Sequence, residues 1–306
     1  MNLLELHAAF LANSLTKQQY IEEMHRWHAH LFDYSEFLRR TEICRIEISD
    51  GRVVMEARKT GIKIICDKCD RRLAPIEILN FGAYEKADSD LLFRLLEDHM
   101  CIFDIGANVG WYSLNFAQAL PTTTIYAFEP IPATFGYLQA NISLNQATQV
   151  HPHNFGFSDR EAELTFYFDP QGSGGASAVD LHGTGVAQKI ECKVRRLDDF
   201  VEASGERVDF IKCDVEGAEL FVLQGGVETL RKYKPVVFAE MLRKWAAKFN
   251  YHPNQIIELM AGLGYCCFVG RGGKLKEIKT VNEDTAETNF FFLHPATHTS
   301  KIAALT

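Results

Sequence analysis

Hydrophobic and polar positions follow two different periods along the middle of the chain. Four short runs are almost wholly apolar: Met100–Phe103, Thr124–Phe128, Val208–Cys213 and Val236–Ala239. Parallel strands that are covered on both faces have this continuous pattern. Segments with apolar residues at helical spacing separate the runs, such as Trp111–Leu120, which Pro121 ends. The pattern predicts an α/β fold built on a mostly parallel sheet.

Further runs extend the predicted sheet. Val150–Phe157 is expected to supply a third strand, and Tyr265–Val269 and Thr288–Leu293 an antiparallel pair that closes the sheet. The pattern assigns residues 81–295 to one α/β domain and leaves residues 296–306 as a tail.

The first 80 residues form a predicted N-terminal extension with a pattern of its own. A helix over Lys17–Leu38 carries a broad apolar stripe that includes Trp27. The stripe has to pack on the core or on a second copy of the chain, and the second case would make residues 1–40 a homodimer interface. Residues 43–66 then alternate as strands do, with an Asp-Gly hairpin signal between two of the runs.

A long segment between two predicted strands is rich in glycine and poor in apolar residues. Residues 169–188 join the strands Glu163–Phe168 and Lys189–Val194. Loops of this length are uncommon inside a compact domain and are often functional. We expect a flexible flap near the acceptor site, that is, the site where a substrate would bind. The alternative is a disordered insertion on the surface.

The turn after the first strand of the domain combines small residues with carboxylates. Asp104 ends the strand, Gly106, Asn108 and Gly110 lie in the turn, and Glu129 ends the next strand. Open parallel sheets bind ligands at this edge, where a carboxylate can accept the hydroxyl protons of a ribose. The two glycines would let the backbone approach a ligand closely, because a Cβ there would collide with it. The alternative is a turn whose glycines serve only helix–strand packing.

The acidic residue in this turn indicates the kind of nucleoside. A dinucleotide site has the pattern G-x-G-x-x-G, with the pyrophosphate at the helix N-terminus. Asp104 would repel a pyrophosphate, whereas it suits S-adenosylmethionine, which carries an ammonium and a sulfonium.

Composition and charge exclude several classes of protein. The 306 residues are 47% hydrophobic, enough for a sizeable core, and the net charge of −8 argues against a broad nucleic-acid-binding surface. No apolar run is long enough to span a membrane, and the first residues, which include Glu5, do not have the form of a secretory signal. Several of the eight cysteines lie in apolar runs, so we expect reduced thiols in a cytoplasmic protein. Cys66 and Cys69 form a lone C-x-x-C with no second pair of ligands, which does not predict a metal site.

Four motifs together resemble those of a known family. They are DIGANVG at 104–110, FEPIP at 128–132, IKCDVEGAE at 211–219 and TNFFFL at 288–293. Their order and spacing are similar to those of the FkbM-type S-adenosylmethionine-dependent methyltransferases, over about Phe81–Leu293. The resemblance implies a class I methyltransferase fold, with a Rossmann-like sheet of seven mostly parallel strands.

The resemblance also implies further cofactor contacts. The family carries an aromatic-Glu pair that Tyr84 and Glu85 match, and it tends to carry an asparagine where Asn154 stands, beside the expected adenine. An amide could both donate to and accept from the adenine edge. The alternatives are a core tyrosine with a nearby carboxylate and a turn-forming asparagine.

Three more carboxylates are the candidates for catalysis. Asp214 and Glu216 follow one apolar strand, and Glu240 ends the next. Methyl transfer to a hydroxyl is an in-line displacement that benefits when a base or a bound metal takes the proton. Asp214 and Glu240 are the preferred bases and Glu216 is the third. A pair of these carboxylates could also hold Mg²⁺.

The resemblance implies O-methylation of a hydroxyl on a sugar or a natural-product small molecule. Two other functions stay open at this point. One is a nicotinamide-dependent oxidoreductase, which the missing G-x-G-x-x-G disfavours, and the other is a non-catalytic nucleoside-binding scaffold. If no carboxylate acts as the base, His153, His182 and His252 are the next candidates.

Overall fold

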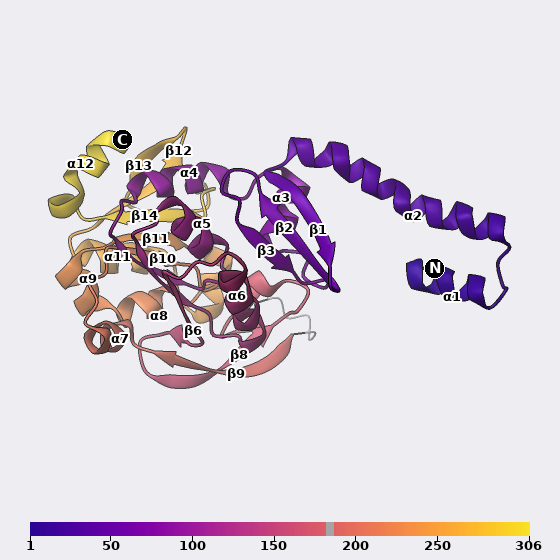
Figure 1. Ribbon diagram of the computed structural model, residues 1–306. Helices are drawn as coiled ribbons and strands as arrows, with labels where there is room; N and C mark the ends of the chain where they lie inside the picture. Colours follow the sequence, from indigo (N-terminus) through magenta and orange to yellow (C-terminus); the bar gives the residue numbers. More distant parts are fainter. Residues whose placement is uncertain (182–186) are drawn as a thin grey trace.

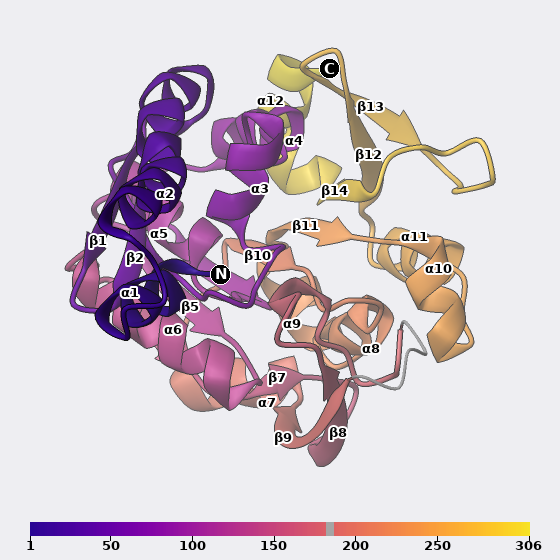
Figure 2. The same cartoon turned by 90° about the vertical axis from the view of Figure 1, so that its right-hand side faces the viewer.

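The computed structural model describes residues 1–181 and 187–306, and its largest sheet crosses the body of the molecule (Figures 1 and 2). Within these ranges the sheet has eight strands in the order β13-β12-β14-β11-β10-β4-β5-β6. The bounds are β4 Cys101–Ile105, β5 Thr124–Phe128, β6 Val150–His153, β10 Phe210–Cys213, β11 Val236–Glu240, β12 Cys266–Arg271, β13 Lys274–Ile278 and β14 Asn289–Leu293. The five strands from β6 to β11 pair in parallel, and β14 pairs antiparallel with both β11 and β12.

This arrangement confirms the α/β class I methyltransferase fold, including the antiparallel closing pair. Seven strands were expected, and β13 adds an eighth at the edge. It returns beside β12 because Gly272 and Gly273 both adopt positive φ, the backbone of a tight two-residue hairpin turn.

Helices cover both faces of the sheet, which is why its strands are continuously apolar. One face packs on α4 (Lys86–Leu95), α5 (Trp111–Ala119) and α6 (Pro132–Leu144); the other packs on α7 (Leu197–Ser204), α8 (Glu219–Gln224), α9 (Val227–Tyr233) and α11 (Asn254–Gly262). In β4, the side chain of Ile102 belongs to the hydrophobic core on the face covered by α4, α5 and α6. The side chains of Phe103 and Ile105 belong to the core on the other face. Residues 296–306 are not a simple tail, because most of them form α12 (Pro295–Leu305), which buries Leu305.

A smaller sheet lies beside the end of β6. It has the order β7-β9-β8, with β7 Gly156–Phe157, β8 Ala162–Phe168 and β9 Gln188–Arg195. The expected single strand Val150–Phe157 is therefore divided between two sheets, with the chain leaving the first sheet at Asn154. A short 3₁₀ helix, η2 (Ser173–Gly175), lies in the segment between β8 and β9.

The N-terminal extension consists of a helical arm and a small sheet. The arm is α1 (Leu3–Leu11) and α2 (Lys17–Phe37), followed by η1 (Leu38–Arg40); the sheet is β1 (Ile43–Ser49), β2 (Arg52–Ala57) and β3 (Lys63–Cys66). The predicted hairpin joins β1 and β2. Side chains of Asn141 on α6 and of Asn145, which directly follows this helix, accept hydrogen bonds from the backbone of β3, and these bonds fix the small sheet to the domain.

The helical arm projects away from the body (Figure 1). A capping box of Thr16 and Gln19 begins α2, and none of the residues of this fully described helix is buried. Trp27, Leu31 and Phe32 are all exposed. The apolar stripe therefore does not pack on the core, and its contact with a second copy of the chain stays a prediction.

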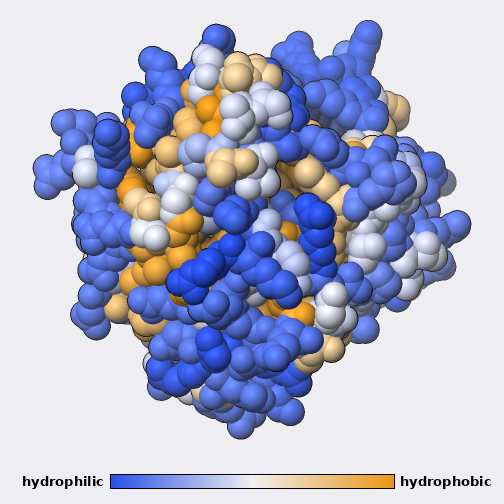
Figure 3. All heavy atoms as spheres, turned by 90° about the vertical axis from the view of Figure 1, so that its left-hand side faces the viewer, coloured by the Kyte–Doolittle hydropathy of each residue, from blue (hydrophilic) through white to orange (hydrophobic). Residues whose placement is uncertain are grey.

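On the side away from the arm, the surface is mainly hydrophilic, with apolar residues in smaller groups (Figure 3). In the part of the chain that the structure describes, no helix combines the length and the apolar character needed to cross a membrane.

Candidate cofactor and acceptor site

A cavity of about 710 Å³ lies at the carboxyl ends of β4, β5, β10 and β11. Among the described residues that line it are eight predicted site residues: Tyr84, Glu85, Gly106, Asn108, Glu129, Asp214, Glu216 and Glu240. The carboxyl ends of parallel strands meet at one edge, so residues more than 100 positions apart come together there. Three further predicted residues, Asp104, Gly110 and Asn154, are not part of the cavity lining.

The glycines of the turn after β4 are required by packing against the protein itself. Gly106 has φ +79°, and a Cβ on it would lie 1.8 Å from the backbone oxygen of Asp214. Gly110 has φ +92°, and its Cβ would lie 2.7 Å from Leu138 Cδ1. Packing within the protein is therefore sufficient to require glycine at both positions, and the close approach of a ligand to them stays a prediction. Gly106 still lines the cavity, because the packed turn forms its wall.

Glu129 is fixed at the end of β5 by the backbone around it. Its Oε2 accepts a hydrogen bond of 3.0 Å from the Asn108 N–H, and its Oε1 accepts one of 2.9 Å from the Ile131 N–H. The residue is only 6% exposed, and burial raises its pKa to about 7. Each oxygen keeps a second lone pair, so the carboxylate can also accept the two hydroxyls of a ribose.

Asp104 lies beneath the turn instead of facing the cavity. Its side chain is fully buried, and its Oδ2 accepts a hydrogen bond of 2.6 Å from the Ser113 hydroxyl. Its Oδ1 lies 3.4 Å from Nζ of Lys212. Asp104 thus stabilises the turn through its contacts with Ser113 and Lys212, whereas the sequence predicted a direct contact with the ligand.

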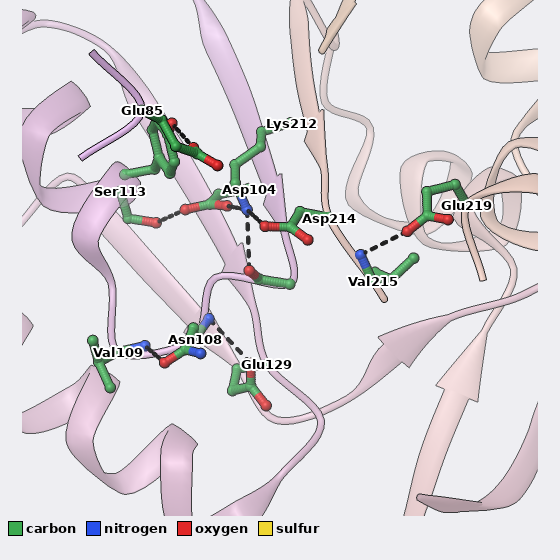
Figure 4. A network of polar contacts seen from close by, with 12 residues as sticks. Glu85, Asp104, Asn108, Val109, Ser113, Glu129, Lys212, Asp214, Val215 and Glu219 are labelled. Carbon is green, nitrogen blue, oxygen red and sulfur yellow. Dashed lines mark hydrogen bonds and ion pairs between the residues drawn. The ribbon is translucent and has the colours of Figure 1, made fainter. Parts of the chain in front are cut away.

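Lys212 is a central residue of the site that the sequence reasoning missed (Figure 4). Its side chain is buried in β10, its Nζ donates to the Gly106 carbonyl at 3.2 Å, and the same atom lies 3.4 Å from Oδ2 of Asp214. Burial acts to lower its pKa, but the charges of Asp214 and Asp104 raise the pKa above its usual value. The sequence did contain a signal for this residue, because Lys212 lies within a mainly apolar strand that is followed by a carboxylate.

The three candidate catalytic carboxylates form one cluster on the other wall of the cavity. One carboxylate oxygen from each of Asp214, Glu216 and Glu240 lies within 4.8 Å of the others. Burial, and then the charge of Asp214, raise the pKa of Glu216 and of Glu240 well above the usual range. A raised pKa keeps a carboxyl group protonated at neutral pH, so a member of the cluster can take the proton of an acceptor hydroxyl only in its ionised form. The hard oxygen donors of the cluster are of the type that Mg²⁺ prefers.

The loop that carries Asp214 and Glu216 is held by a second residue that the sequence reasoning missed. Glu219 is buried, and its Oε1 accepts hydrogen bonds of 3.1 Å from the N–H groups of Val215 and Gly217. Burial raises the pKa of Glu219 to about 7. Because the carboxylate satisfies two backbone donors, it fixes the loop in the conformation in which Glu216 has φ +53°.

Tyr84 and Glu85 enter the cavity from the segment between the extension and α4. Glu85 accepts a hydrogen bond of 2.5 Å from the hydroxyl of Tyr112, and burial raises the pKa of Glu85. The ring of Tyr84 contacts those of Trp111 and Tyr112, with centroids 6.2 and 6.3 Å away. The two residues therefore line the cavity and also pack on α5, and a contact with the cofactor stays a prediction.

Asn154 has the turn-forming role that was the alternative prediction. Its Nδ2 donates to the carbonyls of Glu129 and Pro130, at 2.9 and 3.1 Å, and so shapes the chain after β5. This part of the cavity is lined instead by Pro130, Phe157 and Phe166, which the sequence reasoning did not single out. Apolar faces of this kind can contact a flat purine.

Several described residues of the predicted flap contact the site. Its residues Gln171 and Gly172 line the cavity, the Arg71 N–H donates to the Gln171 carbonyl at 2.9 Å, and the Ser177 hydroxyl donates to the Glu216 carbonyl at 2.8 Å. These residues thus contact the cavity and the loop that carries Glu216, while the role of the segment at an acceptor site and its flexibility stay predictions. Residues 182–186, including the alternative base His182, lie outside the described residues. His153 and His252 do not appear among the described residues of the cavity wall.

The sheet order, the glycine turn and the carboxylates at the strand ends define a class I methyltransferase fold with a nucleoside-sized site. The chain belongs to the methyltransferase FkbM domain family, whose pattern matches residues 104–267.

Several curated relatives show a similar extent of match. "Methyltransferase 1" of Beauveria bassiana is 33% identical over 146 residues, which are 42% of this chain and 59% of that protein. "2-O-methyltransferase NoeI" of Sinorhizobium fredii is 32% identical over 146 residues, 43% of this chain and 59% of that protein. This chain thus spans about three fifths of the length of both. A solved FkbM methyltransferase of Methylobacillus flagellatus superposes with a TM-score of 0.43 at 16% identity, over 64% of this chain and 44% of that one.

Proposed function

We propose that the protein is an S-adenosylmethionine-dependent methyltransferase that methylates a hydroxyl of a sugar or another natural-product small molecule. The observation that carries the proposal is the cavity itself. The backbone fixes the carboxylate of Glu129 at the cavity, and three further carboxylates, from Asp214, Glu216 and Glu240, converge in the lining of the same cavity. The family membership supports the same reaction type.

The residues present fit the proposed cofactor. When bound, it supplies a methyl group on a positively charged sulfur. Glu129 would accept the ribose hydroxyls, and the apolar faces of Pro130 and Phe157 would contact the adenine. The carboxylates of Glu85 and Asp214, which also line the cavity, would favour the positive charges of the ligand over a pyrophosphate.

On the acceptor side, a carboxylate would take the proton of the attacking hydroxyl. Asp214 and Glu240 are the proposed bases, and Glu216 would complete the cluster. The names of two relatives support a hydroxyl or sugar acceptor. They are "Hexuronic acid methyltransferase AglP" of Haloferax volcanii and "31-O-demethyl-FK506 methyltransferase FkbM" of Streptomyces tacrolimicus, each 30% identical to this chain over the matched region.

Thermal unfolding with added ligands tests the proposal first. S-adenosylhomocysteine should raise the unfolding temperature and NAD should not. Radiolabelled S-adenosylmethionine would then be offered with a panel of sugars and hydroxylated natural products, and transfer of label to one of them is the expected result. Stabilisation by NAD alone would favour the oxidoreductase. Tight S-adenosylhomocysteine binding without transfer to any panel member would favour the non-catalytic scaffold.

We also propose that the helical arm, residues 1–40, contacts a second copy of the chain. The exposed apolar residues of α2 support this, because an isolated helix of this length gains little stability in water without a packed face. The eight cysteines, all within the described ranges, are free thiols, which fits the cytoplasmic location that stays a prediction.

A further inference from the structure

Lys212 contacts parts of the site that belong to different strands and loops. Its ammonium contacts Asp104 at the end of β4, the carbonyl of Gly106 in the turn, and Asp214 in the acidic loop, at 3.4, 3.2 and 3.4 Å. Figure 4 shows these groups converging on its nitrogen. The proposed cofactor wall and the proposed acceptor wall therefore share one buried cation.

The chemistry of an ammonium suits this position. Lysine offers three N–H donors around one compact charge, and the three neighbours are all oxygen acceptors. The residue is 3% exposed, so water cannot easily replace these contacts. A buried charge persists only where such partners compensate for its lost hydration.

We propose that Lys212 is a positioning residue for methyl transfer, which holds the cofactor turn and Asp214 in register and partly balances the carboxylates around the cofactor. This inference rests on the proposed function. In addition to its contacts with Asp104, Gly106 and Asp214, Lys212 itself lines the cavity. Its charge would therefore act on the sulfonium of the cofactor as well as on the protein.

The two forms of the cofactor separate these effects. S-adenosylmethionine and S-adenosylhomocysteine differ by one methyl group and by the positive charge on sulfur. Damage to the shape of the turn weakens the binding of both ligands. Loss of the Lys212 charge changes its interaction with the ammonium and the carboxylate of both ligands equally, but it removes a repulsion of the sulfonium only from S-adenosylmethionine. The ratio of the two dissociation constants therefore reports charge, and a purely structural role would leave the ratio unchanged.

The experiment is calorimetric titration of both ligands into the wild type, Lys212→Met and a matched control, Lys244→Met. Lys244 lines the cavity but is exposed, so solvent screens its charge. Lys212→Met should weaken S-adenosylhomocysteine about tenfold or more, because the turn loses a hydrogen bond from a charged donor. It should also shift the ratio about tenfold in favour of S-adenosylmethionine, as expected when a unit charge several ångströms away is removed. Lys244→Met should shift the ratio less than about twofold.

Circular dichroism would verify the fold of each variant. If Lys212→Met does not fold, the double variant Lys212→Met with Asp104→Asn removes both members of the fully buried ion pair, and the remaining partner, Asp214, is partly exposed to solvent. If Lys212→Met folds and its ratio of the two dissociation constants stays within about twofold of the wild-type ratio, the proposed role of Lys212 is overturned while the proposed function stands. Failure of the wild type to bind either ligand would instead overturn the proposed function, and this inference with it.

Discussion

Replacing Glu129 by alanine should weaken the binding of S-adenosylhomocysteine by about 1.5–3 kcal/mol, the range for hydrogen bonds to a charged group. The hydrogen bonds from Asn108 and Ile131 exist with or without ligand, so their loss largely cancels in the binding free energy. That loss should appear instead as a lower unfolding temperature. Only the contacts to the ribose differ between the free and bound states, and they set the expected change in affinity.

Isothermal titration calorimetry on folded protein is the appropriate assay, since it needs no acceptor. Glu228→Ala provides a matched control, because Glu228 is a surface residue paired with Arg231 and should leave the affinity unaltered. Glu129→Gln should give a smaller loss, as its amide oxygen can still accept a hydrogen bond. An affinity of Glu129→Ala within about twofold of the wild type would refute the assignment of Glu129 to the ribose.

Four further predictions concern pH, catalysis, the turn and the arm. Burial raises the pKa of Glu219 from 4.5 to about 7, so the stability that its protonation contributes is fully present below about pH 4.5 and is lost as the pH rises through 7. The unfolding temperature of the free protein should therefore fall from pH 5 to pH 8, and Glu219→Gln should reduce that fall. Glu240→Gln should lower turnover roughly 10²–10⁴-fold with little change in cofactor affinity, whereas Asp214→Asn should lower both, because its carboxylate also faces the positive charges of the cofactor; loss of activity in EDTA with recovery in Mg²⁺ would identify a metal role instead. Gly106→Val should unfold the protein, because its side chain would overlap the backbone across the turn; a native circular dichroism spectrum would contradict this. Trp27→Glu should convert a dimer into a monomer in light scattering, and a wild-type monomer at high concentration would exclude the proposed interface.

The sequence by itself determined the sheet and the edge at which the site lies. Continuous apolar runs specify strands buried on both faces, and the carboxyl ends of parallel strands coincide. Glu129, Asp214 and Glu240 could therefore be placed together before any distance was known. The hairpin at residues 50–51 was equally predictable, since its signal is local.

Only the tertiary structure decided which of these residues face the cavity and which support it. Asp104 and Asn154 lie at strand ends as predicted, yet their side chains bond to the protein itself. Lys212 and Glu219 could be recognised only through their partners, because a buried charge is defined by groups that other segments bring to it. The same limit applies to Gly106. A Cβ at this position would overlap the backbone carbonyl of Asp214, which lies 108 positions further along the chain. A sequence pattern reports the period and the ends of an element, whereas the direction of a side chain and its partners depend on packing between elements.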